Sequence, residues 1–163
     1  MSYWTKVSGI IEVEVPFKSW NANLVKDYIN WSIAEVERRC IKVTGSEGKL
    51  NYYVNVKQDY YTLVTDEKQY YKAVITVCKG LRDREGPITY AEVKKFIKRL
   101  NNFMTIDDIN LLVEGIHTWK IDVPPYDDML DNASEKQINT FYNIIQSNYT
   151  RFADRLIDKL KRK

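Results

Sequence analysis

Four alternating charges stand between two glycines in the segment Gly80–Gly86, which joins a strand-like run to a predicted helix start. Arg82 and Arg84 could bind a carboxylate or a phosphate through bidentate contacts, because each guanidinium group presents paired N–H donors. Backbone N–H groups beside the glycines could extend this arrangement into an anion-binding nest. The arginines can also pair with Asp83, Glu85 or Glu47 and fasten the loops to each other, and the sequence favours such ion pairs because adjacent opposite charges are common on protein surfaces.

Other residue types that carry chemistry are sparse. His117 is the only histidine, and we expect a hydrogen-bonded structural residue on the apolar face of a strand rather than a general base. Cys40 and Cys78 fall in apolar patterns far apart in the chain, which predicts buried free thiols and no zinc site. Neither glycine-flanked segment, Gly45–Gly48 or Gly80–Gly86, has the spacing of a phosphate-binding P-loop. The sequence therefore predicts no catalytic residue, metal or cofactor, and it argues against an enzyme.

The composition is typical of one ordered globular domain. The chain has 163 residues, of which 44% are hydrophobic and 13% aromatic. The N-terminal residues lack the charged region and apolar core of a signal peptide, and no apolar run approaches the roughly 18 residues that span a membrane. We expect a cytoplasmic protein without membrane contact.

Positive charge is concentrated in the last thirteen residues. This terminal segment carries a net charge of +4, so the remaining residues sum to −1. Cations near the end of a helix complement its dipole, and the sequence favours that explanation. The alternative is that the basic residues contact nucleic acid. They are Arg151, Arg155, Lys159, Lys161, Arg162 and Lys163.

Hydrophobic periodicity predicts four strands and three helices. Alternating apolar residues place the strands at residues 7–15, 50–57, 71–79 and 109–123. Apolar residues at steps of three or four place the helices at 23–40, 90–104 and 134–163. Two capping-box pairs mark the starts of the second and third helices. They are Thr89 with Glu92, and Ser134 with Gln137.

The order of these elements predicts an α+β fold. Two βαβ units with right-handed crossovers give a ferredoxin-like βαββαβ sandwich, in which two helices cover one face of a four-stranded antiparallel sheet. We expect this domain to occupy residues 1–125, followed by a linker at 126–133 and an amphipathic C-terminal helix at 134–163. That helix is too long to lie wholly against a small sheet, so its distal part could pair with a second copy as a homodimer, fray, or pack on its own domain.

The predicted topology brings three distant segments to one end of the sheet, beside Trp4. They are the Gly45–Gly48 turn, the Gly80–Gly86 loop and the region of residues 114–119. The resulting cluster of mixed charge is the candidate site for a ligand or partner. Its members are Ser46, Glu47, Arg82, Asp83, Arg84, Glu85, His117 and Trp119.

The motifs of the first 123 residues are the Trp4, Val7 and Gly9 opening, the Gly45–Gly48 turn, Gly80 with Arg82-Asp83, and His117 with Trp119. They resemble those of a group of small uncharacterised proteins of tailed bacteriophages. The resemblance implies a phage setting, and it assigns no catalytic role to any position.

A phage setting favours a non-enzymatic protein that binds a host protein, such as a component of host defence, in the cytoplasm of the host cell. The second expectation is a domain that binds a nucleotide or another anion through the Gly45–Gly48 and Gly80–Gly86 loops. The third is nucleic-acid binding by the basic C-terminal helix.

Overall fold

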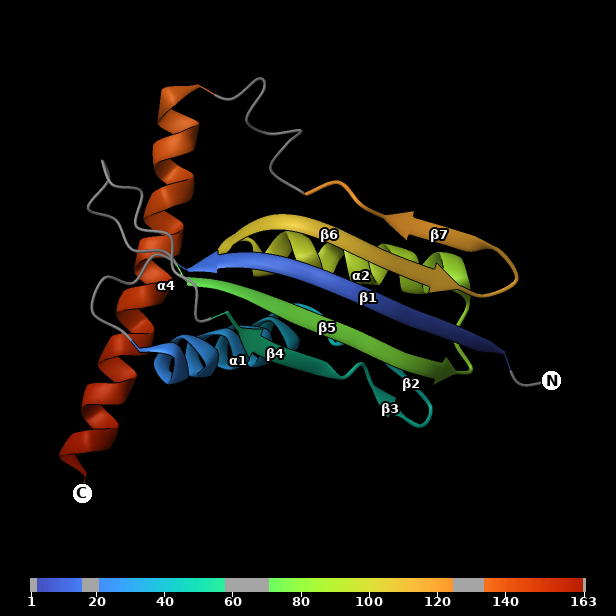
Figure 1. Ribbon diagram of the computed structural model, residues 1–163, viewed down its shortest axis with the longest axis horizontal. Helices are drawn as coiled ribbons and strands as arrows, with labels where there is room; N and C mark the ends of the chain where they lie inside the picture. The colour runs from blue at the N-terminus through green and yellow to red at the C-terminus, as the bar shows by residue number, and fades with distance from the viewer. Residues whose placement is uncertain (1–2, 16–20, 58–70, 125–133, 163) are drawn as a thin grey trace.

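The computed structural model describes residues 3–15, 21–57, 71–124 and 134–162. Within them the chain forms an α+β fold with a five-stranded antiparallel sheet, a small two-stranded hairpin and three helices (Figure 1). The expected linker at residues 126–133 lies outside the described residues.

The sheet has the strand order β4-β5-β1-β6-β7. Its strands are β1 (Trp4–Val15), β4 (Tyr52–Val56), β5 (Tyr71–Arg82), β6 (Thr105–Glu114) and β7 (Thr118–Ile121). The separate hairpin consists of β2 (Thr44–Gly45) and β3 (Gly48–Lys49). All of the strand pairs are antiparallel.

β1 is the central strand and pairs with β5 on one side and β6 on the other. At Gly9 the backbone of β1 leaves no room for a side chain beside β6: its φ is +137°, and a Cβ atom there would lie 2.0 Å from the carbonyl oxygen of Asn110. Because no side chain fits this space, glycine is required for the observed pairing.

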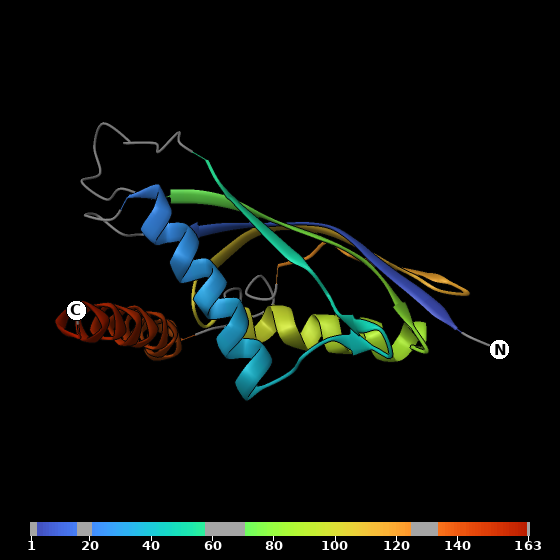
Figure 2. The same cartoon turned by 90° about the horizontal axis from the view of Figure 1, so that it is seen from below.

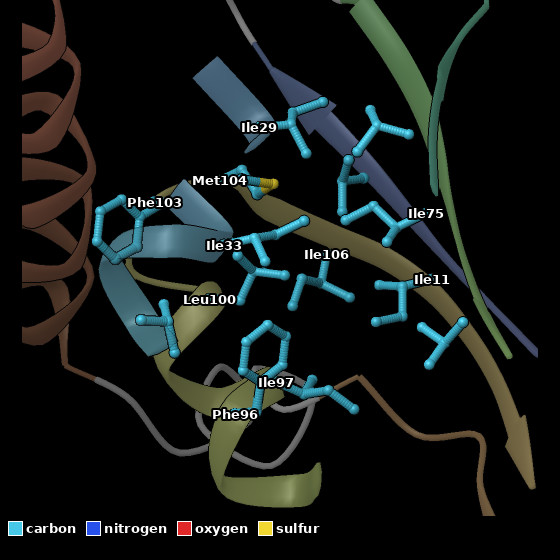
Figure 3. Close-up of a cluster of buried hydrophobic side chains, with 14 of the residues drawn as sticks. Ile11, Ile29, Ile33, Ile75, Phe96, Ile97, Leu100, Phe103, Met104 and Ile106 are labelled. Atoms are coloured by element: carbon cyan, nitrogen blue, oxygen red, sulfur yellow. The ribbon is translucent and has the colours of Figure 1, made fainter. Parts of the chain in front are cut away.

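Two helices cover one face of the sheet, α1 (Ala22–Arg39) and α2 (Gly86–Leu100) (Figure 2). α1 begins where Asn21 accepts a hydrogen bond from the amide of Leu24, as is usual for a helix N-cap. Apolar side chains from both layers form the core (Figure 3). Prominent among them are Ile11, Ile75 and Ile106 from the sheet, and Ile29, Ile33, Phe96, Ile97 and Leu100 from the helices.

The prediction that the second helix begins near residue 90 is wrong. α2 begins at Gly86, with Pro87 in its first turn, where proline needs no amide hydrogen and its fixed φ suits a helix. The hydroxyl of Thr89 donates to the carbonyl of Glu85, so Thr89 lies inside the helix instead of capping it. The helix also ends earlier than expected, at Leu100 instead of residue 104.

The predicted four-stranded sheet also needs correction. The fourth expected strand, 109–123, is two strands, because the chain reverses between β6 and β7, where the amide of Gly115 donates to the carbonyl of His117 at 2.9 Å. The third expected strand continues three residues further, to Arg82. The expected Gly80–Gly86 loop is therefore shorter: only residues 83–85 connect β5 to α2.

Both cysteines are free thiols, as expected, but neither is buried. Cys78 is exposed and Cys40 is half-buried. The apolar residues around Cys78 predict a strand that is covered on both faces. In the structure the Cys78 side chain lies on the face of β5 opposite to that of the buried residues Val77 and Leu81. We call this side the open face, since no described helix covers it.

The C-terminal helix α4 (Glu135–Lys161) begins at the predicted capping box, in which Ser134 and Gln137 bond to each other's backbone. It crosses the end of the molecule opposite the described N-terminal end of β1 (Figure 1). Its middle turns pack on α1: the ring of Tyr28 lies 5.0 Å from that of Tyr149 and 5.3 Å from that of Phe152. These contacts place the middle turns on the chain's own domain. In the distal part, which the prediction concerned, Ile157 and Leu160 are exposed, so pairing with a second copy stays a prediction.

A buried ion cluster fastens α4 to α1. The Glu35 side chain is 6% exposed, and its carboxylate oxygens contact Arg38 at 2.8 Å and Arg39 at 2.9 Å on α1. Arg151 of α4 reaches the same carboxylate at 3.1 Å, and its guanidinium lies over the ring of Trp31. One carboxylate thus joins two helices whose other contacts here are aromatic.

Stability should depend on the charge of Glu35. Burial alone would raise its pKa, but hydrogen bonds from Arg38 and Arg151 and the nearby positive charges outweigh burial and lower it below the ordinary 4.5. A lowered pKa in the folded state gives stability that is complete above pH 4.5 and is lost as the pH falls through the folded value. Urea unfolding of the wild type should show this loss, and Glu35→Gln should be less stable by about 1–3 kcal/mol near neutral pH and less sensitive to acid. Equal acid sensitivity in the two proteins would contradict the role of this cluster.

Candidate functional site

The residues predicted to form a site do gather at one end of the sheet, at the right of Figure 1. The hydroxyl of Ser46, in the turn between β2 and β3, donates to Asp83 at 2.7 Å, and its amide donates to the carbonyl of Arg82 at 3.0 Å. The Arg82 guanidinium donates to Glu47 at 2.7 Å. The small hairpin is therefore attached to the end of β5 by backbone and side-chain contacts.

The expectation that these charges pair with each other is confirmed for Arg82. Its guanidinium contacts Glu47 and, at 3.9 Å, Asp83. The hydrogen bond and charge of Glu47 raise the pKa of Arg82, so it remains a cation. Arg84 pairs instead with Glu92 on α2, and the exposed Glu85 is the N-cap residue of that helix.

An anion nest formed by the backbone of these turns finds no support in the hydrogen bonds. The amide of Asp83 donates to the carbonyl of Tyr3 at 2.6 Å, and the amide of Ser46 is engaged by Arg82. Asp83 has a φ of 60°, a left-handed conformation that aspartate tolerates better than most residues. Nucleotide or anion binding by the Gly45–Gly48 and Gly80–Gly86 segments remains a prediction.

His117 lies in the exposed turn between β6 and β7 rather than on the apolar face of a strand. The odd-numbered positions that predict a strand at 109–123 run on through this turn, and His117 is one of them. For this reason the sequence predicts that His117 lies within a strand. Its ring is perpendicular to that of Trp119 at a centroid distance of 6.1 Å. Trp119 covers Gly86 at the start of α2, where a Cβ atom would lie 2.2 Å from the indole. The indole therefore links the β6–β7 hairpin to the helix.

Exposed apolar side chains accompany these charges. Tyr3 and Trp4 at the start of β1 are 53% and 54% exposed, and Ile116 in the β6–β7 turn is 86% exposed. The sequence predicts Trp4 as a neighbour of the cluster but gives no signal for Tyr3 or Ile116. Tyr3 is exposed because it lies at the end of β1, and Ile116 because it lies in the β6–β7 turn. We refer to Tyr3, Trp4, Arg82, Ile116 and His117 as the end surface.

Attachment of the small hairpin should depend on Gly45. A Cβ atom at this position would lie 2.6 Å from the carbonyl oxygen of Arg82, a backbone atom that cannot move without displacing β5. We expect Gly45→Ala to lower the free energy of unfolding by about 1–3 kcal/mol in chemical denaturation. Gly80→Ala is the matched control, because its Cβ would make an ordinary 3.4 Å contact with Trp4, and it should change stability by no more than about 0.5 kcal/mol. Similar losses in both variants would contradict this assignment.

A hollow of about 270 Å³ lies between α1 and β4. In its wall Lys49 contacts one oxygen of Glu37 at 2.7 Å, while the other oxygen of Glu37 and the hydroxyl of Tyr52 are buried without a hydrogen-bond partner in the described part of the chain. Burial and the charge of Glu37 raise the pKa of Tyr52, so its hydroxyl keeps its proton. The unpartnered oxygen atoms of Glu37 and Tyr52 are buried and do not face the hollow. They therefore give no reason to expect a ligand there.

Two buried tyrosines should respond differently to loss of their hydroxyl groups. The hydroxyl of Tyr28 donates to the carbonyl of Phe103 at 2.5 Å, so Tyr28→Phe removes a buried hydrogen bond and should cost about 1–2 kcal/mol of stability. Tyr52→Phe removes a buried hydroxyl without a partner among the described residues, and should change stability by less than about 0.5 kcal/mol. Thermal and chemical unfolding of the two variants test this difference. A larger loss in Tyr52→Phe than in Tyr28→Phe would show the hydrogen-bond assignment to be wrong.

The basic residues of the C-terminal helix line a shallow groove of about 520 Å³ along α4. Arg151, Arg155, Lys159 and Arg162 contribute to it, but Asp154 and Asp158 lie among them and reduce its positive charge. Lys161 is exposed and does not line this groove. Nucleic-acid binding by this helix remains a prediction.

Within the described ranges, no group of three or more His, Cys, Asp or Glu residues is placed to hold a metal ion. Among the same residues, no helix combines the length and the apolar character needed to cross a membrane.

Comparisons with known proteins give little further information. No protein-family model and no curated protein matches the sequence. Among solved structures, the chain is similar to a phage SAM lyase in complex with S-methyl-5'-thioadenosine, with a TM-score of 0.40 and 11% sequence identity. The match covers 76% of this chain and 92% of that chain. At this TM-score the similarity carries no argument about the activity or ligand of this protein.

Proposed function

We propose that this chain is a non-enzymatic binding protein whose end surface contacts a partner protein. The observation that carries the proposal is the exposure of Trp4 and Ile116 at one end of the sheet. Trp4 is paired across β1 and β5 with Arg82, whose guanidinium is held by Glu47. Protein interfaces are enriched in tryptophan, tyrosine and arginine, and a few such residues usually supply most of the binding energy. A side chain that is already fixed also loses less conformational freedom on binding.

The chemical groups at the same end favour binding over catalysis. Ser46 donates its hydroxyl to Asp83, but its amide is engaged by Arg82 and is not free to stabilise an oxyanion. His117 is exposed in a turn and contacts Trp119, without a hydrogen bond to an acid or a nucleophile among the described residues. The charged groups mainly hold the loops together.

The resemblance to tailed-phage proteins supplies the setting of this proposal. In that setting the partner is a host protein in the cytoplasm of the infected cell, with a component of host defence as the candidate class. A second copy of the chain is the other partner that the sequence predicts, because the terminal helix is long and carries a continuous apolar stripe. The exposure of Ile157 and Leu160 in the distal turns of α4 supports this alternative. That homodimer also remains a prediction.

We propose that β4, β5, β1 and β6 form a ferredoxin-like core to which β7 has been added at one edge. The support is the order of these four strands in the sheet and the position of α1 and α2 on one face. In this view the added β7 and the turn that joins it to β6 place Ile116 and His117 at the end surface.

The experiment is affinity capture from a lysate of the bacterial host with tagged wild-type protein and surface variants. Wild type should retain a stoichiometric protein that Trp4→Ala and Ile116→Ser lose, with binding weakened by about tenfold or more, as expected for central interface residues. Tyr142→Ala is the control, because Tyr142 is 61% exposed on α4, away from the end surface. Recovery of the chain alone, or equal retention by all variants, would contradict the proposal.

A further inference from the structure

We propose that the groove between α1, α2 and α4 binds a small molecule that carries a phosphate group. The groove has a volume of about 400 Å³ and is separate from the end surface. This volume falls in the range of small-molecule sites, and each of the three helices contributes side chains to the walls. We call it the helix groove.

Positive charge dominates the helix groove. Arg39, Lys95, Arg99 and Arg151 line it, against a single carboxylate in the described lining, that of Glu35. The Glu35 side chain is only 6% exposed and already contacts three arginines. The excess of three positive charges is therefore presented to whatever enters the groove, and cations that converge in a concave site attract multiply charged anions.

Two of these cations are held in position before any ligand arrives. Arg39 on α1 and Arg151 on α4 both bond to the same oxygen of Glu35, at 2.9 and 3.1 Å. Arg151 also donates to Asn148, whose amide donates to the carbonyl of Asn102. A guanidinium group has five N–H donors, so each arginine keeps donors beyond those used here.

Docking of α4 does not explain the other two cations. Lys95 and Arg99 are exposed, lie one turn apart on α2, and form no ion pair with any described residue. The Glu35 cluster would hold α4 without them. Their position in the same groove is the observation that separates a ligand site from a purely structural cluster.

The walls indicate the class of ligand. Arginine groups match the geometry of phosphate oxygens and bind them through paired, charge-assisted hydrogen bonds. Val36, Phe103 and the 41% exposed Ile144 add apolar surface beside the cations. A phosphate ester with an apolar or planar body satisfies both parts of the groove, and an inorganic ion would use only the cations.

Isothermal titration calorimetry with AMP, inorganic pyrophosphate and adenosine tests the proposal on the full chain. AMP should bind, pyrophosphate should compete with it, and adenosine should bind at least about tenfold more weakly than AMP, because it lacks the charge-assisted contacts. The double variant Lys95→Gln with Arg99→Gln should weaken AMP binding by about tenfold or more.

The matched control is the double variant Lys94→Gln with Lys98→Gln. It removes the same charge from the same helix, but neither residue lines the groove. Equal weakening in the two double variants would show general charge attraction, and absence of AMP binding to the wild type would also overturn the proposal.

A nucleic-acid phosphate backbone is the other source of the same chemistry, and a single-stranded oligonucleotide provides that arm of the experiment. Retention of the oligonucleotide that depends on Lys95 and Arg99, together with no binding of AMP, would contradict the small-molecule proposal. Oligonucleotide retention that depends on Arg155 and Lys159 alone, together with AMP binding that depends on Lys95 and Arg99, would place nucleic-acid binding on α4 and support the small-molecule site in the groove. None of these residues belongs to the end surface, so failure here is distinguishable from failure of partner capture.

Discussion

The close approach of β1 and β6 at Gly9 is the constraint on which the sheet depends. β1 pairs along both edges, so its register with β6 also fixes the register of β6 relative to β5. Any side chain at Gly9 would collide with the backbone of β6. That register determines where the β6–β7 turn emerges, and hence that Ile116 and His117 lie at the same end as Trp4. The composition of the end surface therefore follows from a backbone contact in the middle of the sheet.

Much of the fold could be predicted because its signals are local. The stripe of α1 and the capping box at Ser134 are patterns of neighbouring residues, and both identify their helices correctly. The start of α2 was missed because two helix-start signals overlap and Pro87 outweighs Thr89. The β6–β7 turn was missed because the hairpin keeps odd-numbered residues such as Leu111 and Ile121 on the same face, so the alternation never breaks.

The part of the candidate site that depends on strand order and direction could be predicted from the sequence. Strand direction alone brings the β2–β3 turn and the end of β5 together, but the choice of Glu92 as the partner of Arg84 depends on where α2 begins. The helix groove had no signal in the sequence, because its lining comes from three helices that are far apart in the chain. Glu35 and Arg151 are far apart in the chain, and no periodicity within one helix connects them.

The exposed thiol of Cys78 makes the open face of the sheet chemically addressable. It lies opposite Ser8 near the middle of β1 and β5, whereas the other thiol, Cys40, is half-buried in the helix layer. A thiol reagent should therefore react first at a single position on the face that the described helices leave uncovered. Such a probe is remote from the helix groove and on the opposite side of the sheet, so it would report which layer of the molecule a partner covers.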